Sequence, residues 1–285
     1  MSTAQGQLNN TVTFSVVDGP GNRFVIFLQG CNFNCVTCHN PYTIATCTNC
    51  GVCVGMCPED ALSIEDGPLV VVDAVACTLC DVCIAVCPTD STPLSRWVTI
   101  EDLLAEIRPV APFISGITVS GGEATQQSEF VAALFAAIKH DEHLSHLTTL
   151  IDSNGAASLE VWNRLIDVMD GAMIDLKALD PATHVTLTAR ENDRVLATIE
   201  YLAQMDRLYE VRLLIVPGYN DDLDTMHRTA VWLRSVDPSM RIKLIGYRSH
   251  GVRSEALHIP QATNELLEKL ALVLADHGFA HLTVV

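Results

Sequence analysis

The stretch FVIFLQGCNFNCVTCHN, residues 24–40, decides how this chain is interpreted. Its first five residues are all apolar and predict a strand that is buried on both faces. Cys31, Cys35 and Cys38 follow in a C-x3-C-x2-C spacing. Three thiolates hold only three irons of an iron–sulfur cube, so the fourth iron keeps an open position, as catalytic metals do. The alternative is a zinc site with His39 as fourth ligand, but His39 directly follows Cys38 and is awkwardly placed to close a tetrahedron.

Eight further cysteines form two copies of one spacing, C-x2-C-x2-C-x3-C, and each copy is followed by Pro. This is the bacterial ferredoxin pattern, in which the fourth cysteine of each run ligates the other cluster. We therefore predict one [4Fe–4S] cluster on Cys47, Cys50, Cys53 and Cys87, and another on Cys57, Cys77, Cys80 and Cys83. Two structural zinc sites are the alternative, although zinc is typically held by two C-x2-C pairs.

The composition excludes several classes of function. The 285 residues are 49% hydrophobic, enough for one large domain or a domain with an insert. A net charge of −17 without any basic run disfavours nucleic acid as a partner. We see neither a membrane span nor a signal peptide in residues 1–10, so we expect a cytoplasmic protein with no membrane partner. All eleven cysteines belong to the three sets above, which makes a disulfide framework a poor explanation.

Strands and helices alternate along the rest of the chain. Strands are expected at 24–28, 117–120, 148–152, 172–175, 211–216 and 242–245. Thr99 should cap a helix that runs to Arg108, and a last helix should cover 264–276. Such alternation indicates parallel strands covered by helices. We predict an α/β fold with a partial (β/α)6 TIM-like barrel from residues 1–40 and 96–285. An inserted ferredoxin-like domain with two [4Fe–4S] clusters, residues 41–95, interrupts it.

Polar and glycine residues follow every predicted strand. The motifs are Gly121-Gly122-Glu123, Asp152-Ser153-Asn154-Gly155, Asp175-Leu176-Lys177 and Gly246-Tyr247-Arg248. In a parallel barrel the carboxyl ends of the strands form one mouth, so these residues should meet the three-cysteine site there. Asp175 and Lys177 alternate along a strand and should share a target, although a surface ion pair is the alternative.

Together these motifs resemble the radical S-adenosylmethionine (SAM) enzymes, and the likeness extends over nearly the whole chain. More narrowly they resemble the glycyl radical enzyme activating enzymes, and most of all the YjjW-type activases with two inserted ferredoxin clusters. The resemblance implies an oxidoreductase that cleaves SAM reductively and abstracts a hydrogen atom from the glycine Cα of a partner glycyl radical enzyme. It also implies three [4Fe–4S] clusters, a flavodoxin- or ferredoxin-type reductant, and an anaerobic habit.

The resemblance also assigns site residues. The SAM contacts it implies are Thr37, Cys38, His39, Gly121, Gly122, Glu123, Asp152, Asp175, Leu176, Lys177, Arg212 and Arg248. A monovalent cation is implied near Asp152, Ser153, Met173 and Asp175. Two positions depart from the family pattern. Thr37 stands where relatives carry an aromatic residue, and Arg248 stands where they carry His, with His250 two residues on as the other candidate.

Three other functions fit parts of the sequence. An electron-transfer protein would need only the ferredoxin-like insert, and leaves Gly121–Glu123 and the three-cysteine site without a purpose. A radical SAM enzyme acting on a small molecule or another peptide would share the core. Peptide modifiers, however, usually place their extra clusters after the barrel rather than inside it. A cluster-based redox sensor would bind without catalysis.

Overall fold

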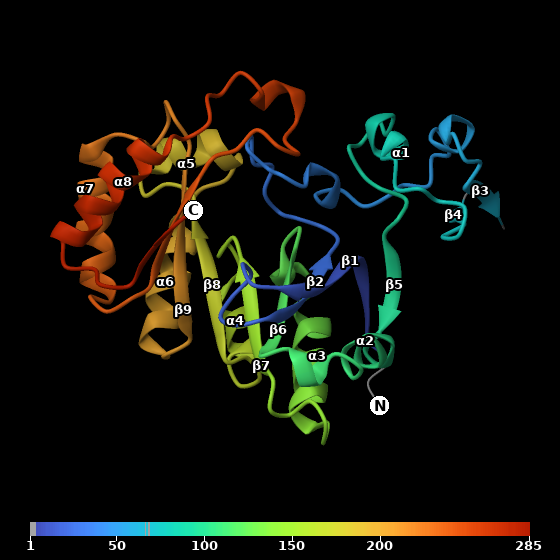
Figure 1. Ribbon diagram of the computed structural model, residues 1–285, viewed down its shortest axis with the longest axis horizontal. Helices are drawn as coiled ribbons and strands as arrows, with labels where there is room; N and C mark the ends of the chain where they lie inside the picture. Colours follow the sequence, from blue (N-terminus) through green and yellow to red (C-terminus); the bar gives the residue numbers. More distant parts are fainter. Residues whose placement is uncertain (1–3, 66, 68) are drawn as a thin grey trace.

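The computed structural model describes residues 4–65, 67 and 69–285, so a few residues of the predicted segments 1–40 and 41–95 lie outside it. Among the described residues a nine-stranded sheet runs in the order β11-β10-β9-β8-β7-β6-β2-β1-β5 (Figure 1). Its parallel strands are β2 (Arg23–Leu28), β6 (Gly116–Gly121), β7 (Thr148–Ser153), β8 (Gly171–Leu176), β9 (Leu208–Ile215), β10 (Ile242–Gly246) and β11 (Leu282–Val284). The six predicted strands are therefore confirmed.

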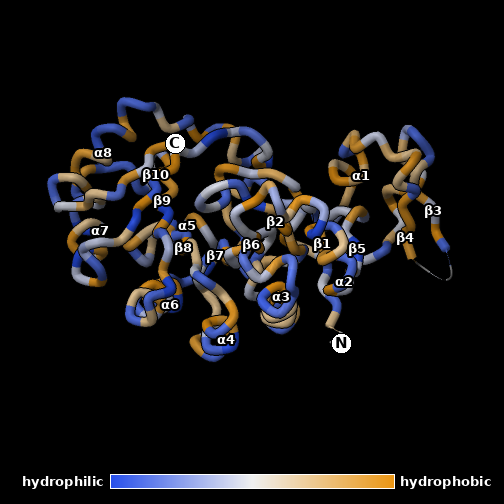
Figure 2. The backbone as a smooth tube through the Cα atoms, turned by 60° about the horizontal axis from the view of Figure 1, so that its bottom comes forward, coloured by the Kyte–Doolittle hydropathy of each residue, from blue (hydrophilic) through white to orange (hydrophobic). Residues whose placement is uncertain are grey.

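Helices connect these strands and cover one side of the sheet. They are α2 (Ile100–Ile107), α3 (Ser128–His140), α4 (Leu159–Leu165), α5 (Pro181–Thr188), α6 (Asp193–Gln204), α7 (Leu223–Val236) and α8 (Asn264–Asp276). Figure 2 shows α3, α4 and α6 in a row beside the strands. Apolar side chains of strands and helices form one large buried cluster. Since β5 and β11 stand at opposite ends of the strand order, the sheet is a partial barrel, as predicted.

Helix boundaries follow local sequence signals. Thr99 caps α2 by accepting a hydrogen bond from the backbone of Asp102 at 3.2 Å, and the Asp102 carboxylate accepts one from Thr99 N at 2.8 Å. This reciprocal capping box satisfies two donors that a helix start would otherwise leave unpaired. The last helix, α8, has the predicted bounds.

Beyond the six predicted strands, the main sheet of the described chain has three others that were not predicted, the parallel strand β11 and two antiparallel strands. β1 (Gln5–Ser15) pairs with β2, and β5 (Arg96–Thr99) pairs with the start of β1. β1 lies toward the edge of the sheet, and most of its residues beyond Leu8 are exposed or half-buried. Its polar sequence therefore lacks the continuous apolar run by which the buried strands were identified.

The segment between β2 and β5 packs apart from the main sheet. It contains a two-stranded sheet of β3 (Leu62–Glu65) and β4 (Leu69–Val72), the short helix α1 (Val82–Ala85) and 3-10 turns at Pro41–Thr43 and Val54–Met56. In Figure 1 it projects beside β1 and β5. Cys53, Leu62 and Val70 form its own small apolar cluster. Further 3-10 turns in the main body are Ala111–Phe113, Ala124–Gln127 and Ser254–Ala256. Of the helices in the described ranges, none has the length and apolarity needed to span a membrane.

Candidate active site

An open cavity of about 330 Å³ lies at the carboxyl ends of the parallel strands. It is lined by the three-cysteine loop and by residues that follow four of the strands. Of the predicted SAM-site residues, the lining includes Thr37, Cys38, His39, Gly121, Gly122, Glu123, Asp152, Asp175, Lys177 and Arg212. Residues up to 227 positions apart in the chain, Asp18 and Ile245, thus meet around one space, because parallel strands bring their carboxyl ends to one edge.

The backbone of two neighbouring segments holds the three-cysteine loop. Cys31 N donates to Ile44 O at 3.0 Å, and Val36 N donates to Leu187 O at 2.9 Å. Burial raises the pKa of the Cys31 thiol to about 12 and that of Cys35 to about 11. The metal-free thiols are therefore protonated at neutral pH, and a metal must displace those protons when it binds.

The two glycines of the Gly121–Glu123 motif let the end of β6 approach the cysteine loop. Gly121 has a φ of +118°, a backbone conformation that residues other than glycine rarely adopt. A Cβ at Gly122 would collide with the carbonyl oxygen of Gly30. Gly122 N also donates to Leu28 O at 2.8 Å. The motif therefore fixes the distance between β6 and the loop as well as leaving backbone open to the cavity.

Glu123 is buried and its carboxylate fastens β6 to β7. Oε1 accepts hydrogen bonds from Thr125 N at 2.9 Å, Thr125 Oγ1 at 2.6 Å and Ser153 Oγ at 2.8 Å. Oε2 accepts one from Asn154 N at 2.7 Å. Burial raises the pKa of Glu123, while these hydrogen bonds favour the charged form. Glu123 thus supports the cavity wall.

Two ion pairs line the cavity floor. Lys177 Nζ lies 2.7 Å from Asp175 Oδ2, and Arg212 Nη1 lies 2.9 Å from Asp152 Oδ1. Burial lowers the pKa of Lys177, but the charge of Asp175, its hydrogen bond to Lys177 and the other negative charges nearby together outweigh burial, and the net pKa is raised. Burial raises the pKa of Asp152 against the opposing charge of Arg212. Asp175 and Lys177 both line this cavity, as expected from their alternation at the end of β8.

The residues around the predicted cation position already have partners. Arg212 Nη2 donates to Met173 Sδ at 2.9 Å and Ser120 Oγ donates to Asp152 Oδ2 at 2.8 Å. Ser153 is bonded to Glu123 through its hydroxyl. Arg212 therefore supplies a positive charge beside Asp152.

Two of the implied SAM contacts, Leu176 and Arg248, and the alternative candidate His250 do not line this cavity, and neither does Met173. The Arg248 guanidinium donates to Ala262 O at 2.6 Å, while its backbone carbonyl accepts from His39 Nε2 at 3.0 Å. Leu176 points to the opposite side of β8 from Asp175, as strand alternation requires. His250 is exposed and also lies outside the lining. Arg248 therefore reaches the cavity only indirectly, because its backbone carbonyl accepts a hydrogen bond from His39, which lines the cavity.

The sequence analysis expected Asn154 at the site as part of its motif but did not predict its contacts, and it missed Glu210 and Asp18. Asn154 Nδ2 lies 3.9 Å from Cys31 Sγ and donates to Asn32 Oδ1 at 2.8 Å. Glu210 accepts from Arg212 Nε at 3.0 Å, which the spacing of two residues along one strand could have indicated. Asp18 joins the lining from the β1–β2 turn, and no local signal in the sequence marks it.

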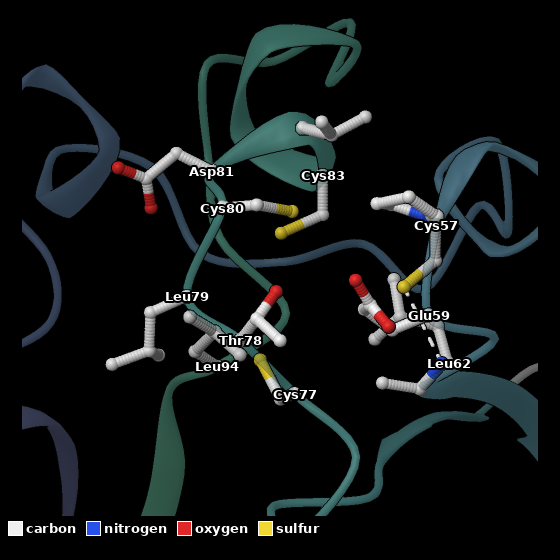
Figure 3. Close-up of a pocket in the computed structure, with 13 residues that line it drawn as sticks. Cys57, Glu59, Leu62, Cys77, Thr78, Leu79, Cys80, Asp81, Cys83 and Leu94 are labelled. Carbon is white, nitrogen blue, oxygen red and sulfur yellow. Dashed lines mark hydrogen bonds between the residues drawn. The ribbon is translucent and has the colours of Figure 1, made fainter.

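The other eight cysteines line two separate pockets in the segment between β2 and β5. Cys57, Cys77, Cys80 and Cys83 surround one, with their sulfur atoms facing a common space (Figure 3). Cys47, Cys50, Cys53 and Cys87 line the other, which Cys83 also borders. In the part of the chain that is described, no three His, Cys, Asp or Glu residues converge tightly enough to hold a single metal ion.

Hydrogen bonds reach some of these sulfurs. Ser91 N donates to Cys87 Sγ at 3.3 Å, and the Thr89 hydroxyl lies 3.4 Å from the same sulfur. Burial alone would raise the pKa of Cys87, but these hydrogen bonds outweigh it and the pKa is lowered.

Similarity to known proteins indicates the family to which this chain belongs. The model of the Radical SAM superfamily matches residues 25–230. The pyruvate formate-lyase 1-activating enzyme of Escherichia coli (strain K12) is 29% identical over 252 residues, which cover 86% of this chain and 82% of that protein. The pyruvate formate-lyase-activating enzyme of Staphylococcus aureus (strain USA300) is 28% identical over 257 residues, or 87% and 83%.

Two solved structures share the fold. A radical SAM methyltransferase from Sphaerobacter thermophilus superposes with a TM-score of 0.60 at 14% identity, covering 98% of this chain and 76% of its own. QueE from Escherichia coli superposes with a TM-score of 0.53 at 13% identity, covering 99% and 94%. With the family model matched over most of its length, this chain belongs to the Radical SAM superfamily.

Proposed function

We propose that this chain activates a partner glycyl radical enzyme. Cys31, Cys35 and Cys38 would hold a [4Fe–4S] cluster that, given one electron by the reductant, would allow SAM to break into methionine and a 5′-deoxyadenosyl radical. The partner's glycine Cα would then give up a hydrogen atom, leaving 5′-deoxyadenosine and a glycyl radical. One observation carries the proposal: Cys31, Cys35 and Cys38 share a single cavity with the charged ends of β7, β8 and β9. The similarity to two pyruvate formate-lyase activating enzymes supports a glycyl radical enzyme as the partner.

The residues of the cavity fit the two cofactors. Cys31, Cys35 and Cys38 all line one cavity, as three ligands of a single cube would. The cavity in front of them, about 330 Å³, lies within the range of about 300–1,000 Å³ that small-molecule sites occupy.

The charges of the cavity suit a ligand that carries a sulfonium cation. Four carboxylates line it against two cationic side chains, Lys177 and Arg212. The carboxylates are Asp18, Glu123, Asp152 and Asp175. We assign the methionine and ribose parts of SAM to Asp152, Asp175 and Lys177, and the adenine to Thr37, Cys38 and His39. A monovalent cation near Asp152 stays a prediction. In the structure, Arg212 provides the positive charge beside Asp152.

The segment 41–95 is proposed to hold the other two [4Fe–4S] clusters, one on each four-cysteine pocket, as in the YjjW-type activases. The crossed arrangement of the pockets, each with three cysteines from one run and one from the other, supports this ligand assignment. A flavodoxin- or ferredoxin-type protein is the proposed reductant.

The proposal is tested with the protein reconstituted anaerobically with iron and sulfide, then reduced and mixed with SAM. We expect 5′-deoxyadenosine from the wild type, none from Cys35→Ala, and retained SAM binding but slower turnover with flavodoxin in Cys50→Ala. Candidate partners are then searched for a glycyl radical by electron paramagnetic resonance (EPR). Product formation by Cys35→Ala at the wild-type rate would refute the site assignment.

A further inference from the structure

The two halves of the insert contain turns of the same geometry after their fourth cysteines. We call residues 57–61 the first turn and residues 87–91 the second turn. Asp60 and Asp90 both have left-handed backbones, with φ of 49° and 50°. Both donate to the carbonyl of their cysteine at 3.3 Å. The final residue of each turn donates its N–H to the cysteine sulfur at 3.3 Å. Differences between the halves therefore come from side chains.

The decisive difference is at the last position of each turn. It is Ala61 in the first turn and Ser91 in the second. The Ser91 hydroxyl is fully buried and donates to Ala45 O at 2.8 Å. The adjoining Ile44 carbonyl accepts from Cys31 N at 3.0 Å. A continuous path of covalent and hydrogen bonds thus runs from Cys87 Sγ through Ser91 and residues 44–45 to Cys31.

Further contacts hold the ends of this path in place. Gln29 Nε2 also donates to Ala45 O, at 2.6 Å, which fixes the carbonyl that Ser91 contacts. Asp90 of the second turn forms an ion pair of 3.6 Å with Arg253, on the loop after β10. Ala61 has no hydroxyl with which to make an equivalent bond. The connection therefore belongs to the second turn.

The two turns also differ two residues after the cysteine. Thr89 places a hydroxyl 3.4 Å from Cys87 Sγ. Its counterpart Glu59 places a carboxylate in the lining of the Cys57 pocket, near Cys57 in Figure 3. Hydrogen bonds to the sulfurs and less negative charge both raise the potential of an iron–sulfur cluster. The cluster that Cys87 would ligate together with Cys47, Cys50 and Cys53 is thus the better electron acceptor of the two.

We propose that Ser91 is a positioning residue that couples the cluster ligated by Cys87 to the three-cysteine loop. Electrons then leave the insert from the cluster on Cys47, Cys50, Cys53 and Cys87. The proposal rests on the proposed function and its three clusters. A reduced flavodoxin-type donor gives one electron to the insert. That electron passes to the three-cysteine cluster, so the insert is oxidised and the three-cysteine cluster is reduced, with no bond made or broken. Electrons tunnel faster along a path of covalent and hydrogen bonds than across empty space. The Ser91 hydroxyl supplies one hydrogen bond of such a path, the one to Ala45 O.

The test compares Ser91→Ala with Thr89→Ala in the fully reconstituted protein. The first turn already carries alanine in the same geometry, so Ser91→Ala is compatible with the fold. Each protein is mixed with reduced flavodoxin, without SAM, and frozen at intervals for EPR. The signal of the three-cysteine cluster is identified as the one absent from Cys35→Ala. Midpoint potentials of the insert are measured in parallel.

In Ser91→Ala we expect several-fold slower reduction of the three-cysteine cluster, with the potentials of the insert unchanged because the N–H bond to Cys87 remains. In Thr89→Ala we expect the reverse: a lower insert potential and no slowing. Transfer at the wild-type rate in Ser91→Ala would overturn the inference. Normal transfer in a wild type that never cleaves SAM would refute the proposed function alone, so the two failures are distinguishable.

Discussion

Replacing Glu123 by glutamine should destabilise the protein despite the near-identical shape of the two side chains. Each carboxylate oxygen accepts a backbone N–H, from Thr125 at 2.9 Å on one side and Asn154 at 2.7 Å on the other. In either orientation, the amide NH2 of glutamine therefore points its hydrogens at a buried donor. The charged acceptor is lost and one N–H is left unpaired.

The cost follows from those two losses. A hydrogen bond to a charged group contributes about 1.5–3 kcal/mol and an unsatisfied buried donor costs about 1–3 kcal/mol, so we expect a total of about 2.5–6 kcal/mol. For a chain of this size each kcal/mol lowers the thermal midpoint by about 2 °C, which predicts a decrease of about 5–12 °C. SAM affinity should fall as well, because Asn154 also contacts Cys31 and Asn32.

The assay is anaerobic thermal unfolding followed by circular dichroism, with SAM affinity measured by calorimetry. Glu129→Gln is the matched control, since that side chain is 84% exposed and should change stability by less than about 0.5 kcal/mol. An unchanged midpoint for Glu123→Gln would refute the reasoning. It would mean that the native carboxyl group is already neutral or that the NH2 group finds another acceptor.

Two further substitutions probe the cavity. Gly122→Ala should cost about 1–3 kcal/mol through overpacking against the cysteine loop and reduce the iron bound per chain. Gly55→Ala, with open space around its added Cβ, is the control for iron content, and equal values in both variants would contradict the prediction. Lys177→Met should weaken SAM binding about tenfold or more, because hydrogen bonds to charged groups contribute about 1.5–3 kcal/mol. Calorimetry checks this against Lys269→Met, whose exposed ion pair on α8 lies outside the cavity lining, and equal affinities would refute it.

Much of the fold could be predicted because its signals are local. The buried strands are short apolar runs, and β2, β6, β7 and β8 are each followed by residues that line the cavity. Thr99 caps its helix through residues three positions away. The strand β1, second from the edge of the sheet, was missed because it carries polar residues and most of it is exposed or half-buried. Its turn brings Asp18 into the cavity, so that contact was missed with it.

The predicted role of Arg248 shows what a family pattern does not determine, the direction of a long side chain. A family pattern can place a residue near a site, but the direction of a long side chain depends on nearby acceptors. Here the guanidinium donates to Ala262 O, and the backbone of the same residue contacts His39. The roles of Asn154 and Glu123 likewise depend on the adjacency of β6 and β7, which separate segments of the chain supply.

The sequence alone determined the three cysteine sets and the alternation that builds a parallel sheet, because ligand spacing and hydrophobic period are properties of short segments. Only the tertiary structure decided which charges pair across the cavity, and that Ser91 rather than Ala61 reaches the three-cysteine loop. The Ser91–Ala45 and Arg212–Asp152 contacts join residues that lie 46 and 60 positions apart. They exist because strand order and the docking of the insert bring them within hydrogen-bonding distance, which no local pattern encodes.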